Sequence, residues 1–225
     1  MIRPLEPAGE ALYRPLQADS WTLGHLGQSL DGQIATRGGD SFYVTCEANL
    51  DHLHRLRALA DAVIVGAETV ARDDPRLTVR RVAGLNPVRV VLDPRRRLDS
   101  HFKLFTDGEA RTLLVVADGD PRQPPCRDVV SVPYEQGQLD LAALVQVLRA
   151  RGLRRLFVEG GGRTVSAFLE AGLLDRLHLC VAPLIIGDGR PGLTLPPVAR
   201  LAEAIRPQTA AYAMGRDVLF DCCLS

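Results

Sequence analysis

The sequence has little lysine, few aromatic residues and no net charge. Lys103 is the only lysine, so nearly all of the 27 basic residues are arginines, and 27 aspartates and glutamates balance them. Without an overall charge, no long-range field favours nucleic acid or an anionic membrane. We therefore expect no nucleic-acid partner and no membrane partner. Arginine number alone is not evidence for phosphate binding.

Cysteine is scarce as well, and long apolar runs are missing. The five cysteines show no CxxC spacing, and an odd count argues against a disulfide framework. Residues 1–16 mix proline with charge where a signal peptide needs an apolar stretch, and no window reaches the length of a membrane span. These absences predict a cytoplasmic protein with reduced thiols.

The apolar content is sufficient for one folded core. Hydrophobic residues make up 46% of 225 residues, which is typical of a soluble globular protein. Residues 1–18 mix proline and charge without periodicity, so we expect an irregular N-terminal extension there. Residues 19–225 are expected to form a single domain, since no linker interrupts them.

Strand and helix patterns alternate along most of the chain. Short apolar runs predict buried strands at residues 21–28, 62–65, 88–92, 112–117 and 156–158. Helical patterns occupy residues 50–60, 68–72, 139–149 and 164–171. Two late apolar runs, residues 178–186 and 217–222, have no helix between them, which indicates an antiparallel edge. The order predicts a three-layer α/β fold with a mixed, mostly parallel central sheet and helices on both faces.

One charged residue breaks the pattern of the helix at residues 50–60. Leucines form one face of this helix, while His52, His54 and Arg55 are expected on the other. Arg57 falls seven residues after Leu50 and therefore lies inside the apolar stripe. An arginine in that place needs a buried partner.

Two strands end in glycine turns that lead into helices. Gly66 follows the run at residues 62–65, and Gly160–Gly162 follow the run at residues 156–158. Backbone N–H groups and the dipole at a helix N-terminus attract phosphate, and two such turns could hold the two ends of one nucleotide. Tight turns also need glycine for conformational reasons alone.

Each of the carboxylates and arginines near these strand ends has two possible roles, one in binding or catalysis and one in the local structure. Glu159 lies at the ligand-binding edge of a parallel sheet, or it caps a helix. Asp73 and Asp74 could serve acid–base work or a divalent metal, but Asp before Pro also ends helices. Arg95–Arg97 suit the 2′-phosphate of NADPH, or they form a solvated basic turn. The histidines lack the spacing of a zinc site, so no metal is expected.

Several motifs in order resemble a known family. SLDG (29–32), DAVIVGAETVARDDPRLTVR (61–80), NPVRVVLDP (86–94) and the stretch around VEGGG (158–162) are similar to the reductase domain of the bifunctional riboflavin-biosynthesis deaminase/reductase. The resemblance runs from about residue 21 to the end of the chain. It implies a dihydrofolate-reductase-like fold and reduction of the ribose of 5-amino-6-(5-phosphoribosylamino)uracil to a ribityl chain by NADPH. No HxE with a later PCxxC occurs, so we expect a reductase alone.

The resemblance also implies which residues line the site. Those implied for the cofactor are Gly27, Gln28, Tyr43, Thr69, Asp73, Pro94 and the loop 161–167 with Gly161, Gly162, Arg163 and Thr164, to which the glycine and basic turns add Gly66 and Arg95. Those implied for the substrate are Ser41, Arg57, Leu77, Arg80 and Glu159. Glu159 is the first candidate for assisting proton transfer, and Asp31 is the second.

Two positions depart from the family pattern. His25 stands where members commonly have a lysine, and it is a weaker, titratable cation. Tyr43 stands where tryptophan is common. The resemblance implies a homodimer. The open alternatives are a reductase of 2,5-diamino-6-ribosylamino-pyrimidinone 5′-phosphate or of a pterin or dihydrofolate-like substrate, and a non-catalytic nucleotide-binding module.

Overall fold

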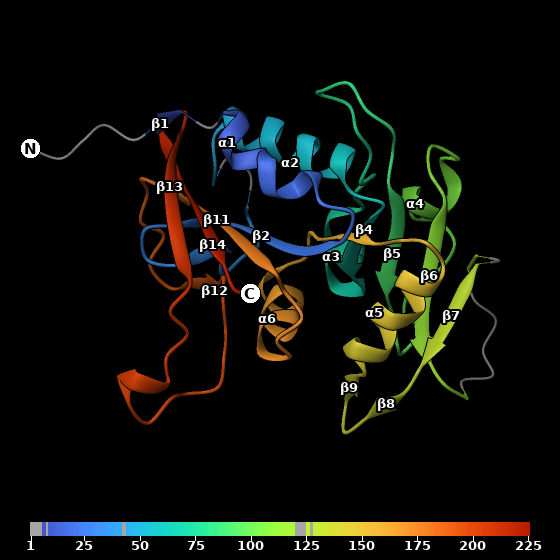
Figure 1. Cartoon of the computed structure of the whole chain (residues 1–225). Coiled ribbons are helices and arrows are strands. Elements are labelled where there is room, and N and C mark those ends of the chain that lie inside the picture. Colours follow the sequence, from blue (N-terminus) through green and yellow to red (C-terminus); the bar gives the residue numbers. More distant parts are fainter. Residues whose placement is uncertain (1–5, 8, 42–43, 120–124, 127) are drawn as a thin grey trace, which may run out of the picture.

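A ten-stranded sheet forms the centre of the molecule (Figure 1). The computed structural model describes residues 6–7, 9–41, 44–119, 125–126 and 128–225. In sheet order the strands are β1 (Glu6–Pro7), β13 (Gln208–Met214), β14 (Asp217–Cys223), β11 (Arg176–Ala182), β2 (Trp21–Ser29), β10 (Arg155–Val158), β4 (Ala62–Gly66), β5 (Val88–Leu92), β6 (Thr112–Ala117) and β7 (Val129–Val132). Only the pairs β11–β14 and β13–β14 are antiparallel.

Helices cover both faces of this sheet, and two small two-stranded sheets accompany it (Figure 1). The helices are α1 (Glu10–Tyr13), α2 (Glu47–Leu59), α3 (Ala67–Asp73), α4 (Lys103–Thr106), α5 (Leu141–Ala150) and α6 (Gly162–Glu170), with 3-10 turns η1 (Arg14–Gln17) and η2 (Leu201–Glu203). The small sheets pair β3 (Gln33–Thr36) with β12 (Gly189–Pro191) and β8 (Tyr134–Glu135) with β9 (Gln138–Leu139). The predicted mixed, mostly parallel sheet with an antiparallel edge is confirmed.

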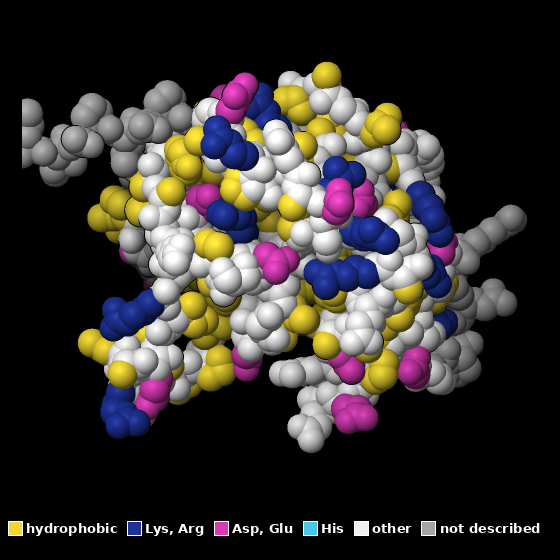
Figure 2. Space-filling model, in the orientation of Figure 1, with side chains coloured by type: hydrophobic (Ala, Val, Ile, Leu, Met, Phe, Trp, Pro, Cys, Tyr) yellow, Lys and Arg dark blue, Asp and Glu magenta, His cyan; other side chains and the backbone are white. Residues whose placement is uncertain are grey.

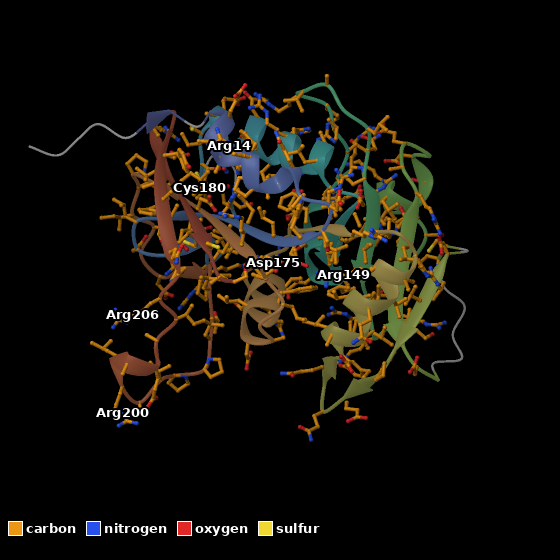
Figure 3. The ribbon with its side chains drawn as sticks, viewed as in Figure 1. Arg14, Arg149, Asp175, Cys180, Arg200 and Arg206 are labelled. Carbon is orange, nitrogen blue, oxygen red and sulfur yellow. The ribbon has the colours of Figure 1, made fainter. Side chains whose placement is uncertain are left out.

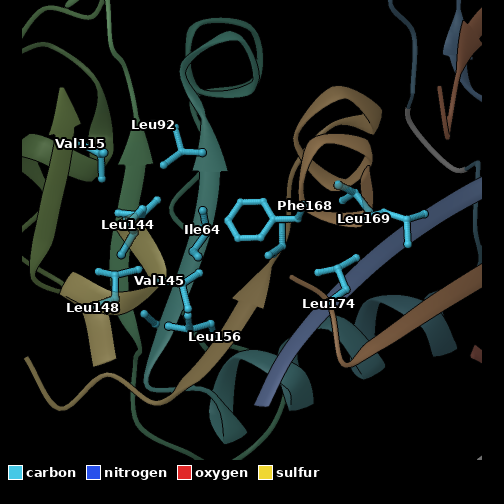
Figure 4. Packing of buried hydrophobic residues seen from close by; sticks show 14 of the residues in the cluster. Ile64, Leu92, Val115, Leu144, Val145, Leu148, Leu156, Phe168, Leu169 and Leu174 are labelled. Atoms are coloured by element: carbon cyan, nitrogen blue, oxygen red, sulfur yellow. The ribbon is translucent and has the colours of Figure 1, made fainter. Parts of the chain in front are cut away.

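The two faces of the sheet bury separate clusters because successive side chains of a strand point to opposite faces. Ile64 packs toward α5 and α6, as Figure 4 shows with Phe168 and Leu144 nearby. Its neighbours Val63 and Val65 belong to the cluster on the other face, which contains Leu56 of α2. Strands buried on both faces read as continuous apolar runs. That is why the central strands were predictable.

The N-terminal stretch is less irregular than the sequence suggested. Residues 10–17 form the short helix α1 and the 3-10 turn η1. Leu12 and Leu16 are fully buried, and the Trp21 indole N–H donates to the Leu16 carbonyl at 3.1 Å. Burial of these side chains against the domain gives a short proline-containing stretch a defined fold.

The polar face that was expected for α2 is wrong for two of its three residues. His52 and His54 are buried rather than solvated, and only Arg55 of the three is exposed. His52 accounts for the difference, because its ring nitrogens lie 2.8 Å from the Tyr13 hydroxyl and 3.1 Å from His178 Nδ1. Partners far apart in the sequence therefore make a polar residue buriable.

A projecting arm follows β12. Residues 193–206 extend from the body of the molecule and include η2; Figure 3 labels Arg200 and Arg206 on it. Basic and acidic side chains are interspersed over the face shown in Figure 2 rather than gathered in one basic patch. Among the described residues, no helix has both the length and the apolar composition that a membrane crossing requires.

Candidate active site

Four neighbouring strands end at one edge of the sheet and bring the predicted site residues there. Strands β2, β10, β4 and β5 are adjacent and parallel. Gly27 and Gln28 near the end of β2, Glu159 after β10, Gly66 at the end of β4 and Pro94 after β5 therefore lie along the same edge. Ligands of open α/β sheets bind at this edge. Asp175, labelled in Figure 3, marks the opposite edge, where it accepts a hydrogen bond from the backbone of Thr22.

The two glycine turns touch each other. A Cβ at Gly66 would lie 2.8 Å from Thr164 Oγ1, and one at Gly160 would lie 2.5 Å from Thr164 Cβ. The Gly161 backbone N–H donates to Thr69 Oγ1 at 3.3 Å. The turns after β4 and β10 are thus joined by the threonines of α3 and α6 and form one continuous surface.

Packing against the rest of the protein requires glycine at one position of this surface but not at another. A Cβ at Gly162 would overlap the carbonyl oxygen of Gly192, so packing alone requires glycine there. At Gly161 the nearest atom to an added Cβ is Thr69 Oγ1 at 3.4 Å, an ordinary contact, and its φ of −61° is accessible to any residue. Protein packing does not explain Gly161.

The surface fits the phosphates of a dinucleotide. Helices α3 and α6 both begin at it, and the first backbone N–H groups of a helix have no partner within the helix. The bare backbone at Gly161 forms a cradle that a Cβ would fill. N–H groups and helix dipoles together favour bound anions.

Arg57 of α2 forms a bidentate ion pair with Glu159. Arg57 Nε donates to Glu159 Oε2 at 2.6 Å, and a terminal nitrogen donates to Oε1. The side chains are only 9% and 17% exposed. Burial alone would lower the pKa of Arg57, but the charge and hydrogen bonds of Glu159 outweigh it and the pKa is raised. The prediction that Arg57 needs a buried partner is confirmed.

The segment after α3 wraps around this pair. Leu77 is buried and has a φ of +54°, which is uncommon for a residue with a side chain. This turn presents the Thr78 carbonyl to Arg57, which donates to it at 3.0 Å. His54 Nδ1 accepts from the backbone N–H of Arg80 at 2.8 Å. The strained turn therefore sets Arg80 beside the Arg57–Glu159 pair.

Arg80 is the exposed cation of this group. Its guanidinium donates to Thr78 Oγ1 at 2.6 Å, and the residue is otherwise open to solvent. Partial burial and the charges of Arg57 and Arg76 lower its pKa from the usual arginine value. The local field at Arg80 is positive and favours an anion.

His25 does not act as the cation that the sequence analysis considered. Its Nε2 lies 3.0 Å from Asn49 Oδ1, and Asn49 donates to Thr45 Oγ1 at 2.9 Å. Burial, together with the charge of His178, lowers the pKa of His25 to about 3, so the ring is neutral at pH 7. A Cβ at Gly27 would lie 2.7 Å from the Thr45 methyl group. His25 thus supports Thr45 against Gly27 from beneath the site.

Asp31 holds two loops together. Its carboxylate accepts hydrogen bonds from Ser29 Oγ at 2.5 Å and from the backbone N–H groups of Ile186 and Gly187 at 3.2 and 2.6 Å. The hydrogen bond from Ser29, with those from the backbone, lowers the pKa of Asp31 to about 2. Charged at neutral pH and occupied by three donors, this carboxylate is a poor proton donor.

The remaining predicted residues are spread along the site edge. Gln28 lies against Gly192, whose added Cβ would be 2.7 Å from Gln28 Oε1. Asp73 is the last residue of α3, and burial raises its pKa. Arg95 donates to the Tyr134 hydroxyl at 3.1 Å, two strands away from Glu159. Ser41 is exposed, and Arg163 is on the first turn of α6. Tyr43 lies outside the described residues.

Thr45, Asn49, His54 and Thr78 also shape the site, although the sequence analysis assigned them no role there. His54 carried a signal that its assignment to the polar face missed, since residues three apart on a helix are neighbours and His54 precedes Arg57 by three. Asn49 carried none, because polar residues at a helix start usually serve as caps. Thr45 ends a loop, residues 40–45, whose hydroxyls and carboxylates could bind sugar or phosphate but are as readily explained by turns.

Comparison with known proteins agrees with this arrangement. The family model for the RibD C-terminal domain matches residues 22–207. A protein of Methanothermobacter thermautotrophicus named 2,5-diamino-6-ribosylamino-4(3H)-pyrimidinone 5′-phosphate reductase is 38% identical over 86% of this chain and 93% of its own length. The riboflavin biosynthesis protein RibD of Escherichia coli is 31% identical over 80% of this chain, which spans about half of that protein (53%).

Solved structures share the fold. A deaminase/5-amino-6-(5-phosphoribosylamino)uracil reductase of Thermotoga maritima superposes with a TM-score of 0.76 at 25% identity and covers 96% of this chain and 59% of its own. The riboflavin biosynthesis reductase Rib7 of Saccharomyces cerevisiae, at 19% identity, has a TM-score of 0.74 and covers 92% of this chain and 91% of its own. The chain belongs to the family of the RibD C-terminal domain, the pyrimidine reductases of riboflavin biosynthesis.

Proposed function

We propose that this chain reduces the ribosyl group of a phosphorylated ribosylaminopyrimidine to a ribityl group with NADPH. The observation that carries the proposal is the Arg57–Glu159 pair at the edge where both glycine turns meet. An anchored carboxylate beside a phosphate-binding surface suits a polar substrate held against a dinucleotide. Membership of the reductase family supports the same reaction class.

Two pyrimidines are candidates for the substrate. The protein matched over nearly its whole length is named for the 2,5-diaminopyrimidinone phosphate, whereas the Thermotoga maritima enzyme is named for the 5-aminouracil compound. The length match favours the diaminopyrimidinone for this chain. The two differ only in the substituent at one ring carbon, so the same sugar chemistry applies to both.

NADPH supplies the hydride when it is bound. Gly162 and Arg163 would hold its phosphates with backbone N–H groups, and Gly161, whose own N–H donates to Thr69 Oγ1, would leave room for them. The hydroxyl of Thr69 and the carboxylate of Asp73 would face its ribose. Arg95 is the candidate for the extra phosphate that distinguishes NADPH from NADH. Gly27 and Gln28 form the floor at the end of β2.

Glu159 would orient the substrate. Arg57 donates to both oxygens of Glu159 and fixes their orientation, so the remaining lone pairs would accept hydrogen bonds from N–H and O–H groups of the pyrimidine and the sugar. From there it assists proton movement as the ring-opened sugar takes up hydride. Asp31 is less suited, because its oxygens already serve the loops.

Arg80 is the better candidate for the substrate phosphate. The donors of Arg57 are directed at Glu159 and the Thr78 carbonyl, which leaves it to position the carboxylate. Arg80 is exposed beside this pair and lies in a positive local field. Leu77 is buried in the apolar cluster that contains Leu56, so it would hold this turn in place under the substrate, and Ser41 would face the substrate from the loop after β3.

The test compares wild type with Glu159→Gln on both pyrimidine phosphates, following loss of the reduced-nicotinamide absorbance band. Wild type should oxidise NADPH with at least one of them, and the variant should lose most of its kcat while still binding NADPH. A pterin and dihydrofolate serve as control substrates. Turnover of only those controls would contradict the proposed substrate class.

We also infer a cytoplasmic homodimer. The arm at residues 193–206 and its base expose Leu195 (37%), Val198 (50%), Leu201 (78%) and Ile205 (54%). Clustered exposed apolar side chains mark association surfaces, and most soluble oligomers are symmetric dimers of one chain. Light scattering of the purified chain measures the mass directly.

A further inference from the structure

Arg190 on β12 has a guanidinium nitrogen for which the described part of the chain offers no hydrogen-bond partner. Its NH1 atom is buried and has no hydrogen-bond acceptor among the described residues. Arginine is always charged, and a buried donor without an acceptor costs free energy. Arg190 is partly buried as a residue, and it differs from the buried arginines Arg57 and Arg89 of the described chain, each of which has a carboxylate partner.

The position of Arg190 links it to the cofactor surface. The next two residues, Pro191 and Gly192, press their carbonyl oxygens against Gly162 at the start of α6. Strand β12 therefore runs beside the helix N-terminus that faces the glycine turns. The guanidinium covers Gly39, where an added Cβ would lie 2.9 Å from NH2.

A carboxylate lies near but not in contact. The charge of Arg190 acts on Asp73 and counters the burial that raises the pKa of that carboxyl group. No ion pair within 4 Å joins the two in the part of the chain that the structure describes. Arg190 and Asp73 thus face one region from β12 and from the end of α3, with the N-terminus of α6 beside them.

We infer that Arg190 is a further cofactor-binding residue, whose guanidinium donates to a phosphate of the nicotinamide dinucleotide. A phosphate oxygen supplies the acceptor that NH1 lacks, and the helix N-terminus and guanidinium favour the same anion. This inference rests on the proposed function. It adds the strand pair β3–β12 to the site, since Arg190 pairs in register with Ala35.

Direct binding measures this role without turnover. The affinity of Arg190→Gln for NADPH and for NADH is measured by titration calorimetry, alongside wild type, Arg190→Lys and the control Arg37→Gln. Arg37 directly follows β3, its side chain is 79% exposed, and it forms an ion pair with Asp188. Loss of one charge-assisted hydrogen bond corresponds to about tenfold to a hundredfold weaker binding. Arg190→Lys should recover part of the loss, and Arg37→Gln should match wild type.

The outcomes separate this inference from the proposed function. Equal weakening for both cofactors assigns Arg190 to the shared diphosphate, and weakening for NADPH alone assigns it to the 2′-phosphate. The thermal midpoint of the free Arg190→Gln variant should equal that of wild type or exceed it, because an unsatisfied donor is removed. Wild-type affinity in Arg190→Gln overturns the inference alone. Failure of wild type to bind either dinucleotide overturns the proposed cofactor and this inference with it.

Discussion

Removing either partner of the Arg57–Glu159 pair should destabilise the fold far more than removing both. The side chains are 9% and 17% exposed, and the pair is bidentate. Glu159→Leu leaves a buried guanidinium without its carboxylate, and such a broken pair costs about 3–5 kcal/mol. Arg57→Met leaves the Glu159 carboxylate without its charged partner in the same way. The double variant buries no unpaired charge and should lie within about 1 kcal/mol of wild type, since apolar replacement of buried pairs is often near neutral.

Chemical denaturation of the four proteins measures the coupling as a double-mutant cycle. The control cycle uses Glu68 and Arg72, an exposed pair one helical turn apart with 50% and 38% exposed side chains. Its coupling should be no more than about 0.5 kcal/mol. Additive losses at Arg57 and Glu159, with coupling as small as in the control, would refute the idea that the two side chains form one buried unit.

Three further predictions follow from single contacts. Gly161→Ala should keep wild-type stability but raise the KM for NADPH. Gly162→Ala should unfold at a lower denaturant concentration, because of the two added Cβ atoms only the one at residue 162 meets a backbone oxygen. Equal stabilities of the two variants would contradict this. The lowered pKa of His25 means that the unfolded chain binds a proton more readily, so stability is full above pH 6.5 and falls toward pH 3. His25→Gln, which can still donate to Asn49, should reduce the loss between pH 7 and 5 by about 2 kcal/mol; an unchanged pH profile would show that His25 is not the source. Leu201→Glu should shift a dimer toward monomer in light scattering if the arm is the interface; an unchanged mass would exclude Leu201 from it.

The central strands were predictable from the sequence, whereas the edges were not. Strands β4, β5 and β6 are buried on both faces, and their apolar runs mark them directly. Strand β13 begins with the exposed residues Gln208–Ala210, and its apolar residues are mostly alanine, which does not favour strands. Strands β3 and β12 lie in glycine-rich stretches, where pairing with each other, not local propensity, makes them strands.

The site was predictable in its residue types but not in its pairings. The position of Arg57 in an apolar stripe predicted that it has a buried partner. It could not identify Glu159 as that partner, because Glu159 lies 102 residues later in the chain. Long separations in sequence also hid the burial of His52, whose partners in α1 and β11 lie 39 and 126 residues away. Arg190 gave no signal, because one arginine among many in a loop looks solvated until its surroundings are known.

The proposed reaction transfers a hydride from NADPH to the ribosyl group, and deuterium labelling follows that hydride into the product. The chain is incubated with each pyrimidine phosphate and NADPH that carries deuterium at the transferable position, and the product is analysed by mass spectrometry. Hydride transfer to the sugar should give a ribityl product that carries the deuterium at the former anomeric carbon. A product without the label, or no product from either pyrimidine, would contradict it.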